Sequence, residues 1–129
     1  MKHRFDLRVY YEDTDLAGIV YYANYLKFIE RARSEYIRAL GIDQARLRAD
    51  DGIVFAVRHL EADFLRPARF DDQLWVQTSP QQVSGARIVL RQNVRRADVH
   101  LFGAVVTLVA LDRDGRARRM PAEIRRILP

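Results

Sequence analysis

Residues 11–41, YEDTDLAGIVYYANYLKFIERARSEYIRALG, join a polar loop with three acids to the strongest helical pattern in the chain. At about 100° per residue from Tyr25, the apolar side chains fall within about 120°, the width of a core-facing stripe. Asn24 is a suitable N-cap, and Gly41 suits the position after the helix because glycine tolerates positive φ. The pattern predicts a helix over residues 25–40. Its predicted core-facing residues are Tyr25, Phe28, Ile29, Ala32, Tyr36, Ala39 and Leu40.

Length and composition exclude several classes of protein. With 129 residues the chain is expected to form one domain, spanning 1–129, with its own core. The absence of cysteine excludes a disulfide framework, a thiol nucleophile and thiolate zinc sites. No apolar run follows Met1, so neither a signal peptide nor membrane insertion is expected, and the cytoplasm is the predicted location.

The rest of the chain predicts an antiparallel sheet. Residues 42–52 are interpreted as a connection with one possible helical turn, and 120–128 as a short terminal helix. The segment at 101–111 is apolar on both faces, yet only one long helix is available to cover the sheet, so a second subunit is expected to supply the other cover. The fold class is therefore α+β, with one long helix packed on one sheet. The predicted strands are 5–11, 53–64, 74–82, 87–95 and 101–111.

Most catalytic chemistries lack support in this sequence. No serine lies in a G-x-S-x-G motif, and no glycine-rich phosphate loop is present. The three histidines have no spacing typical of a triad or metal site, so no metal is expected. His59 is interpreted as a surface or edge residue, and His100 as structural.

The acids before the long helix remain as candidates. Amides at a helix N-terminus can bind an oxygen that becomes negative during a reaction, and one such donor is worth about 3 kcal/mol in known oxyanion holes. A neighbouring carboxylate could act as nucleophile or as general base. Thioesters suit this arrangement because a thiolate, with a conjugate-acid pKa of about 8.5, leaves without a strong general acid. Spacing alone equally allows Asp13 and Asp15 to be ordinary capping and turn residues.

The run YYEDTDLAGIVYYANYLKFIERARSEYIRALGI resembles the signature of the hotdog-fold acyl-CoA thioesterases, in the branch that includes 4-hydroxybenzoyl-CoA thioesterase and the Tol-Pal-associated thioesterases of Gram-negative bacteria. A weaker similarity continues through FLRPARFDDQLWVQT. The resemblance implies a five-stranded antiparallel sheet wrapped around one long central helix. It also implies a homodimer, or a homotetramer formed by two dimers, with sites at the dimer interface.

The same resemblance assigns roles to residues. Asp15, the second aspartate of D-T-D, is similar to the family's catalytic carboxylate, and Tyr22 to the residue whose backbone N–H polarises the thioester carbonyl. Gly18 would let the loop approach the substrate, and Asp13 would support the loop. Tol-Pal-associated members usually carry histidine at the position of Tyr22, so the motif Tyr22-Ala23-Asn24-Tyr25 is closer to that of the hydroxybenzoyl type. Another hotdog branch uses a helical glutamate, which makes Glu30 and Glu35 rival candidates.

The acyl group and the partners stay open at this point. Tyr21, Tyr22 and Tyr25, with Phe28 and Phe55, could line an aryl pocket or fill the core, and short, long and aryl acyl groups are all compatible. No cofactor is expected, because CoA belongs to the substrate. Its phosphates are expected to meet arginines, for which the candidates are Arg87, Arg91, Arg116, Arg118 and Arg119.

The net charge of +5 allows two further interpretations. Arginine supplies 20 of the 22 basic residues, which fits either a phosphate-bearing partner or the codon usage of a GC-rich genome. The basic surface could dock an acidic acyl carrier protein or a phospholipid-synthesis enzyme. Nucleic-acid binding is not expected, because the basic residues are spread along the chain without an interleaved aromatic patch.

Overall fold

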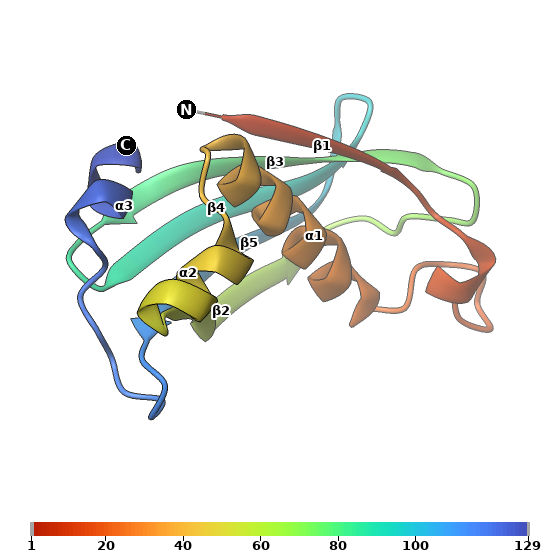
Figure 1. Ribbon diagram of the computed structural model, residues 1–129. Helices are drawn as coiled ribbons and strands as arrows, with labels where there is room; N and C mark the ends of the chain where they lie inside the picture. Colours follow the sequence, from red (N-terminus) through yellow and green to blue (C-terminus); the bar gives the residue numbers. More distant parts are fainter. Residues whose placement is uncertain (1, 129) are drawn as a thin grey trace.

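The computed structural model describes residues 2–128 (Figure 1). Its elements are β1 (His3–Arg8), the 3-10 turn η1 (Tyr11–Asp13), α1 (Asn24–Ala39), α2 (Gln44–Asp51), β2 (Val54–Phe64), β3 (Gln73–Val83), β4 (Arg87–Arg96), β5 (Val99–Leu111) and α3 (Ala122–Ile127).

The five strands form one antiparallel sheet in the order β1-β3-β4-β5-β2. The sheet curves around α1, which packs against β1, β3 and β4 (Figure 1). This confirms the predicted α+β class and the central helix. The order leaves β1 and β2 as the two edge strands, so each has one side without a neighbouring strand among residues 2–128.

The apolar stripe of α1 is largely as predicted. Tyr25, Phe28, Ile29, Ala32 and Tyr36 are all buried in the core.

Two parts of the stripe prediction were wrong. Ala39 is exposed, because it lies in the last turn of the helix, and the stripe omitted two residues that are buried, Arg33 and Ile37. Asn24 is not the N-cap: Ala23 occupies that position without a side-chain bond, and Asn24 is the first helical residue.

Arg33 is buried between α1 and the sheet although it carries a charge. Its Nη1 donates to Oε1 of Gln92 at 3.0 Å, and Gln92 Nε2 donates to the Ile29 carbonyl at 2.9 Å and to Thr78 Oγ1 at 3.0 Å. Desolvation lowers the pKa of Arg33, against an opposing effect of Glu30. The four residues fix the middle of α1 to β3 and β4.

Two segment predictions need correction. Residues 44–51 form a two-turn helix instead of a connection, because Asp43 Oδ1 accepts from the Arg46 amide and Gly52 ends the helix at φ +67. The first strand is β1, His3–Arg8, and not 5–11. The chain leaves the strand at Val9 to enter the acidic loop, and the Val9 amide bonds to the Asp72 carbonyl.

The inner face of β5 is fully covered, whereas on the outer face Val105 and Thr107 are half-buried. This strand therefore lacks part of the cover that its sequence requires.

None of the helices within residues 2–128 has the length and apolar character that crossing a bilayer demands.

His59 and His100 both lie where the sequence indicated. His59 is exposed on the edge strand β2. His100 lies on the outer face of β5, with Nε2 3.0 Å from Asn93 Oδ1, in space that Gly103 leaves open. Partial burial, with the charges of Arg95 and Arg91, lowers the pKa of His100 below its ordinary value of 6.5, although a hydrogen bond with the Phe102 backbone opposes the shift.

Replacing His100 with Gln is expected to make stability less sensitive to acid. The unfolded chain takes up a proton on this histidine near pH 6.5, whereas the folded chain resists protonation until a lower pH. The contribution of neutral His100 to the free energy of unfolding is therefore complete above about pH 6.5, and it is lost as the pH falls from there through the lower pKa of the folded chain. Melting temperatures at about pH 7.5 and about pH 5 should differ more for the wild type than for His100→Gln. Equal losses in both proteins would contradict the assignment.

Candidate active site

The acidic loop folds into a small hairpin before α1. Thr14 pairs with Val20, and the Asp15 amide bonds to the Ile19 carbonyl at 2.9 Å. Asp15 opens the turn at its tip: Oδ1 accepts from the Ala17 amide at 2.9 Å, and the carbonyl accepts from the Gly18 amide at 3.0 Å. Gly18 has φ +78, which glycine adopts without steric cost. The turn leaves the Asp15 carboxylate exposed to solvent.

Asp13 lies two residues earlier but points into the protein. It is 6% exposed, and its carboxylate accepts from the Tyr10 amide and from Asn24 Nδ2, both at 2.8 Å. Asp13 thus ties the loop to the first turn of α1, which confirms its predicted supporting role. The same contact explains why Asn24 is not a cap, since its side chain donates to a carboxylate instead of accepting from the helix.

The start of α1 leaves a backbone donor free. The Tyr21 amide bonds to the Asp13 carbonyl, and the Asn24 amide bonds to the Tyr21 carbonyl. Among the hydrogen bonds of residues 2–128, the Tyr22 amide has no acceptor. A free N–H at a helix N-terminus is suited to binding an oxygen with negative charge.

Tyr22 also lines an apolar pocket of about 330 Å³. The ring of Tyr22 meets Phe64 edge-on at 6.2 Å between centroids. Tyr25 forms a wall of the pocket, but it is only 4% exposed and stacks on Phe102 at 4.9 Å. The complete lining is Ile19, Val20, Tyr22, Tyr25, Phe64, Leu65, Arg66 and Pro67.

Tyr25 therefore has a structural role in addition to its place in the pocket wall. Its hydroxyl accepts from the Ala68 amide at 3.0 Å, and burial raises its pKa. Phe28 and Phe55 were also allowed either a pocket or a core position by the sequence. Phe28 is completely buried, whereas Phe55 is half-buried and lines neither the Tyr22 pocket nor the hollow at Asp15.

Tyr21 stands outside this lining and next to it. Its ring lies 4.9 Å from that of Tyr22, and both side chains are exposed. A hydrogen bond with the Tyr22 hydroxyl raises the pKa of Tyr21, and the nearby charge of Asp15 acts in the same direction. The charge of Asp15 therefore acts on Tyr21, whose ring also contacts the pocket-lining ring of Tyr22.

Asp15 lines a separate, wide hollow of about 950 Å³. This hollow and the Tyr22 pocket share no lining residue, so within one chain Asp15 and Tyr22 line different spaces. A further hollow of about 460 Å³ between α2 and α3 contains none of the candidate residues. The hollow beside Asp15 is lined by Tyr11, Glu12, Thr14, Asp15, Leu16, Gly18 and Phe70.

The rival candidates lie elsewhere. Glu30 accepts from Ser34 Oγ on the exposed side of α1, and Glu35 pairs with Arg38. Neither glutamate lines the Tyr22 pocket or the hollow at Asp15. Of the arginines proposed for CoA, Arg87 and Arg91 lie on β4, and the other three lie between β5 and α3. None of these five lines either space.

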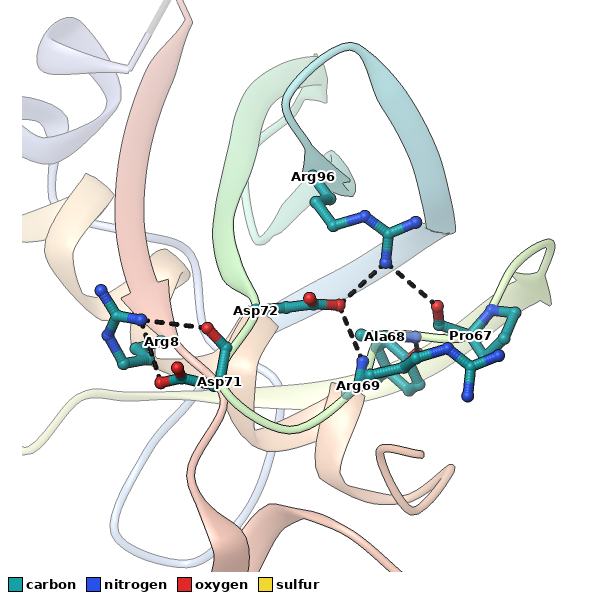
Figure 2. Close-up of polar contacts among 8 residues, drawn as sticks. Arg8, Pro67, Ala68, Arg69, Asp71, Asp72 and Arg96 are labelled. Carbon is teal, nitrogen blue, oxygen red and sulfur yellow. Dashed lines mark hydrogen bonds and ion pairs between the residues drawn. The ribbon is translucent and has the colours of Figure 1, made fainter. Parts of the chain in front are cut away.

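Sequence reasoning missed the contribution of the loop over residues 65–72, between β2 and β3. The Val20 amide bonds to the Ala68 carbonyl at 2.8 Å, and Ile19 pairs with Arg69, so this loop supports the hairpin. Figure 2 shows how the loop itself is held: Asp72 accepts from the Arg69 amide and from Arg96 Nη1, both at 2.8 Å. The segment FLRPARFDDQLWVQT contained a signal for this loop, but nothing local indicated which residues it would contact.

Comparisons with known proteins agree with this architecture. The acyl-CoA thioesterase YbgC of Haemophilus influenzae is 43% identical over 108 residues, which cover 84% of this chain and 79% of the relative. A probable thioesterase from Bartonella henselae has a TM-score of 0.90 and 38% identity, covering 94% of this chain and all of the other. The 4-hydroxybenzoyl CoA thioesterase from Pseudomonas sp. strain CBS-3 has a TM-score of 0.91 and 26% identity, covering 98% of both chains.

The sequence profile of the Thioesterase superfamily matches residues 17–103, a range that contains the second half of the hairpin, α1, the 65–72 loop and the strands beside them. Together with the H. influenzae relative and the solved thioesterase structures, this match shows that the chain is a hotdog-fold member of the Thioesterase superfamily.

Proposed function

We propose that this protein hydrolyses acyl-CoA thioesters to the free acid and CoA, with Asp15 as the catalytic carboxylate and the Tyr22 amide as the oxyanion donor. The observation that carries the proposal is the unpaired Tyr22 N–H at the start of α1, beside an apolar pocket. The exposed carboxylate of Asp15 on the adjoining turn supplies the second group that the reaction needs.

The chemistry follows from these two groups. The carbonyl oxygen of the thioester becomes negative when a nucleophile attacks its carbon, and the Tyr22 N–H stabilises that charge. Asp15 either takes a proton from the attacking water, or attacks the carbon itself and forms an acyl anhydride, which water hydrolyses to the free acid after the thiolate has left. The CoA thiolate then leaves as the C–S bond breaks, without a strong acid to protonate it. No cofactor is required, because CoA arrives as part of the substrate.

The pocket beside Tyr22 would receive the acyl group. Tyr25 and Phe64 provide aromatic walls, Tyr21 would contact the substrate where the pocket opens, and Gly18 would shape the turn that presents Asp15. Short aliphatic, long aliphatic and aryl groups are all compatible with this apolar lining, and a panel of thioesters decides between them.

The active protein is a homodimer, or a homotetramer formed by two dimers, in this proposal. The open edge of β2, the incomplete cover of β5, and the separation of Asp15 from the Tyr22 pocket within one chain all support a second copy at the site. Light scattering should then give a mass of at least twice 15.1 kDa. A monomer with full activity would contradict this arrangement.

The location proposed for this protein is the cytoplasm, where CoA thioesters are available.

Release of free thiol from a panel of short, long and aromatic acyl-CoAs tests the activity. Turnover on at least one of them is expected, and the best substrate names the acyl class. If folded protein releases no thiol from any, acyl-CoA hydrolysis is excluded, and thioesters on acyl carrier protein become the next substrates to assay.

A further inference from the structure

Arginines around the 65–72 loop fall into two groups. Arg8 donates to Asp71, and Arg96 donates to Asp72, so these two are paired with acids of the loop (Figure 2). Arg66 and Arg69 belong to the loop itself, and within residues 2–128 neither guanidinium has an acid or other hydrogen-bond partner. Both side chains are exposed.

The backbone that carries these two free arginines is held firmly. The Arg66 amide bonds to the Leu101 carbonyl at 3.0 Å, and the Arg69 amide bonds to Asp72 Oδ2 at 2.8 Å. Between them, the Ala68 amide bonds to the Tyr25 hydroxyl, and Arg96 reaches the Pro67 carbonyl (Figure 2). A fixed backbone with free charged side chains suits recognition, because less conformational entropy is lost on binding.

The two arginines lie beside the proposed acyl pocket. Arg66 lines that pocket together with Tyr22, and it is the one charged residue in the lining. Arg69 pairs in a short β-bridge with Ile19, which lines the same pocket. With no acid in the lining, the potential at this side of the pocket favours a negative group.

We infer that Arg66 and Arg69 form an anion-recognition element at the acyl pocket, which binds a negatively charged group of the substrate. The inference rests on the proposed function. A guanidinium binds phosphate and carboxylate in the same bidentate way, so the charge could come from the phosphates of CoA or from a carboxylate on the far end of the acyl group.

Four thioesters separate these two sources. Glutaryl-CoA and pentanoyl-CoA differ by a terminal carboxylate, and the corresponding pantetheine thioesters lack the CoA phosphates. Arg66→Gln, Arg69→Gln and the double variant are compared with Arg48→Gln, which removes an exposed charge on α2, away from the pocket. The value of kcat/KM should fall by about 10- to 100-fold for the anionic substrates that the element recognises, and should stay near wild type in the control.

The pattern of loss names the anion. A loss on both CoA esters that disappears on pantetheine identifies the phosphates, and a loss on both glutaryl esters alone identifies the acyl carboxylate. Values within about twofold of the Arg48→Gln control on all four substrates would overturn the inference while leaving the hydrolase activity intact.

Calorimetry provides a readout that does not need turnover. The dissociation constants of all four thioesters are measured on Asp15→Asn protein with and without the arginine substitutions. They should rise by a similar factor for the thioesters that carry the recognised anion and stay unchanged for the others. If the wild type hydrolyses nothing, the proposed function fails on its own account. In that case, dissociation constants that the arginine substitutions leave unchanged would also reject the anion element. Dissociation constants that the same substitutions raise would support it.

Discussion

Replacing Asp15 with Asn is expected to lower kcat by about 100-fold or more while leaving the melting temperature unchanged, because general-base or nucleophilic roles are worth at least that factor. Asparagine cannot take the proton or attack the carbonyl as a carboxylate does. It can still accept from the Ala17 amide through Oδ1, so the turn should survive. Steady-state thiol release on the best substrate measures the loss, and thermal melting checks the fold.

Glu12→Gln is the matched control for this experiment, since Glu12 is an exposed acid in the same loop and lines the same hollow. It should retain most of the activity. Full turnover by Asp15→Asn, or an equal loss in Glu12→Gln, would remove Asp15 from the catalytic role.

Replacing Asp13 with Ala is expected to lower the free energy of unfolding by about 2–4 kcal/mol, because two charge-assisted hydrogen bonds are lost in a buried setting. The Tyr10 amide and Asn24 Nδ2 would both lose their acceptor. Urea denaturation followed by circular dichroism measures the change. The loop should also loosen against α1, so activity should fall together with stability.

Asp13→Asn provides a graded comparison. Its single carbonyl oxygen can serve one of the two donors, while its amide group faces the other, so the loss should be intermediate or close to that of Ala. An unfolding midpoint equal to that of the wild type in both variants would contradict the structural role. We therefore expect opposite results at the two aspartates. Replacing Asp15 should lower kcat without changing stability, whereas replacing Asp13 should act mainly by lowering the free energy of unfolding.

The fold could be predicted from sequence where the pattern is local. The period of 3.6 residues in α1 and the alternation in the strands report which face is buried, so the helix and the five strands were found with small errors at their ends. The helix α2 was missed because its residues, QARLRADD, show little apolar periodicity. Its formation depends on Asp43 and Gly52 at its two ends.

Errors at the candidate site come from contacts between distant residues. Asn24 looked like a cap because no local pattern could show that Asp13 would accept from its side chain. The burial of Arg33 depends on Gln92, 59 residues away, and the free Tyr22 amide depends on how the hairpin enters the helix. Sequence patterns alone could indicate the acids and the helix, but not which aspartate points inward.

The contact between Arg33 and Gln92 also limits how the sequence can diverge. Changing either residue alone leaves a buried charge or a buried amide without its partner, and such losses are severe. Changing both to apolar residues of similar volume can be neutral, as is found for other buried polar pairs. These two positions should therefore tolerate substitution only as a pair, and redesign of the helix–sheet interface should treat them as one unit.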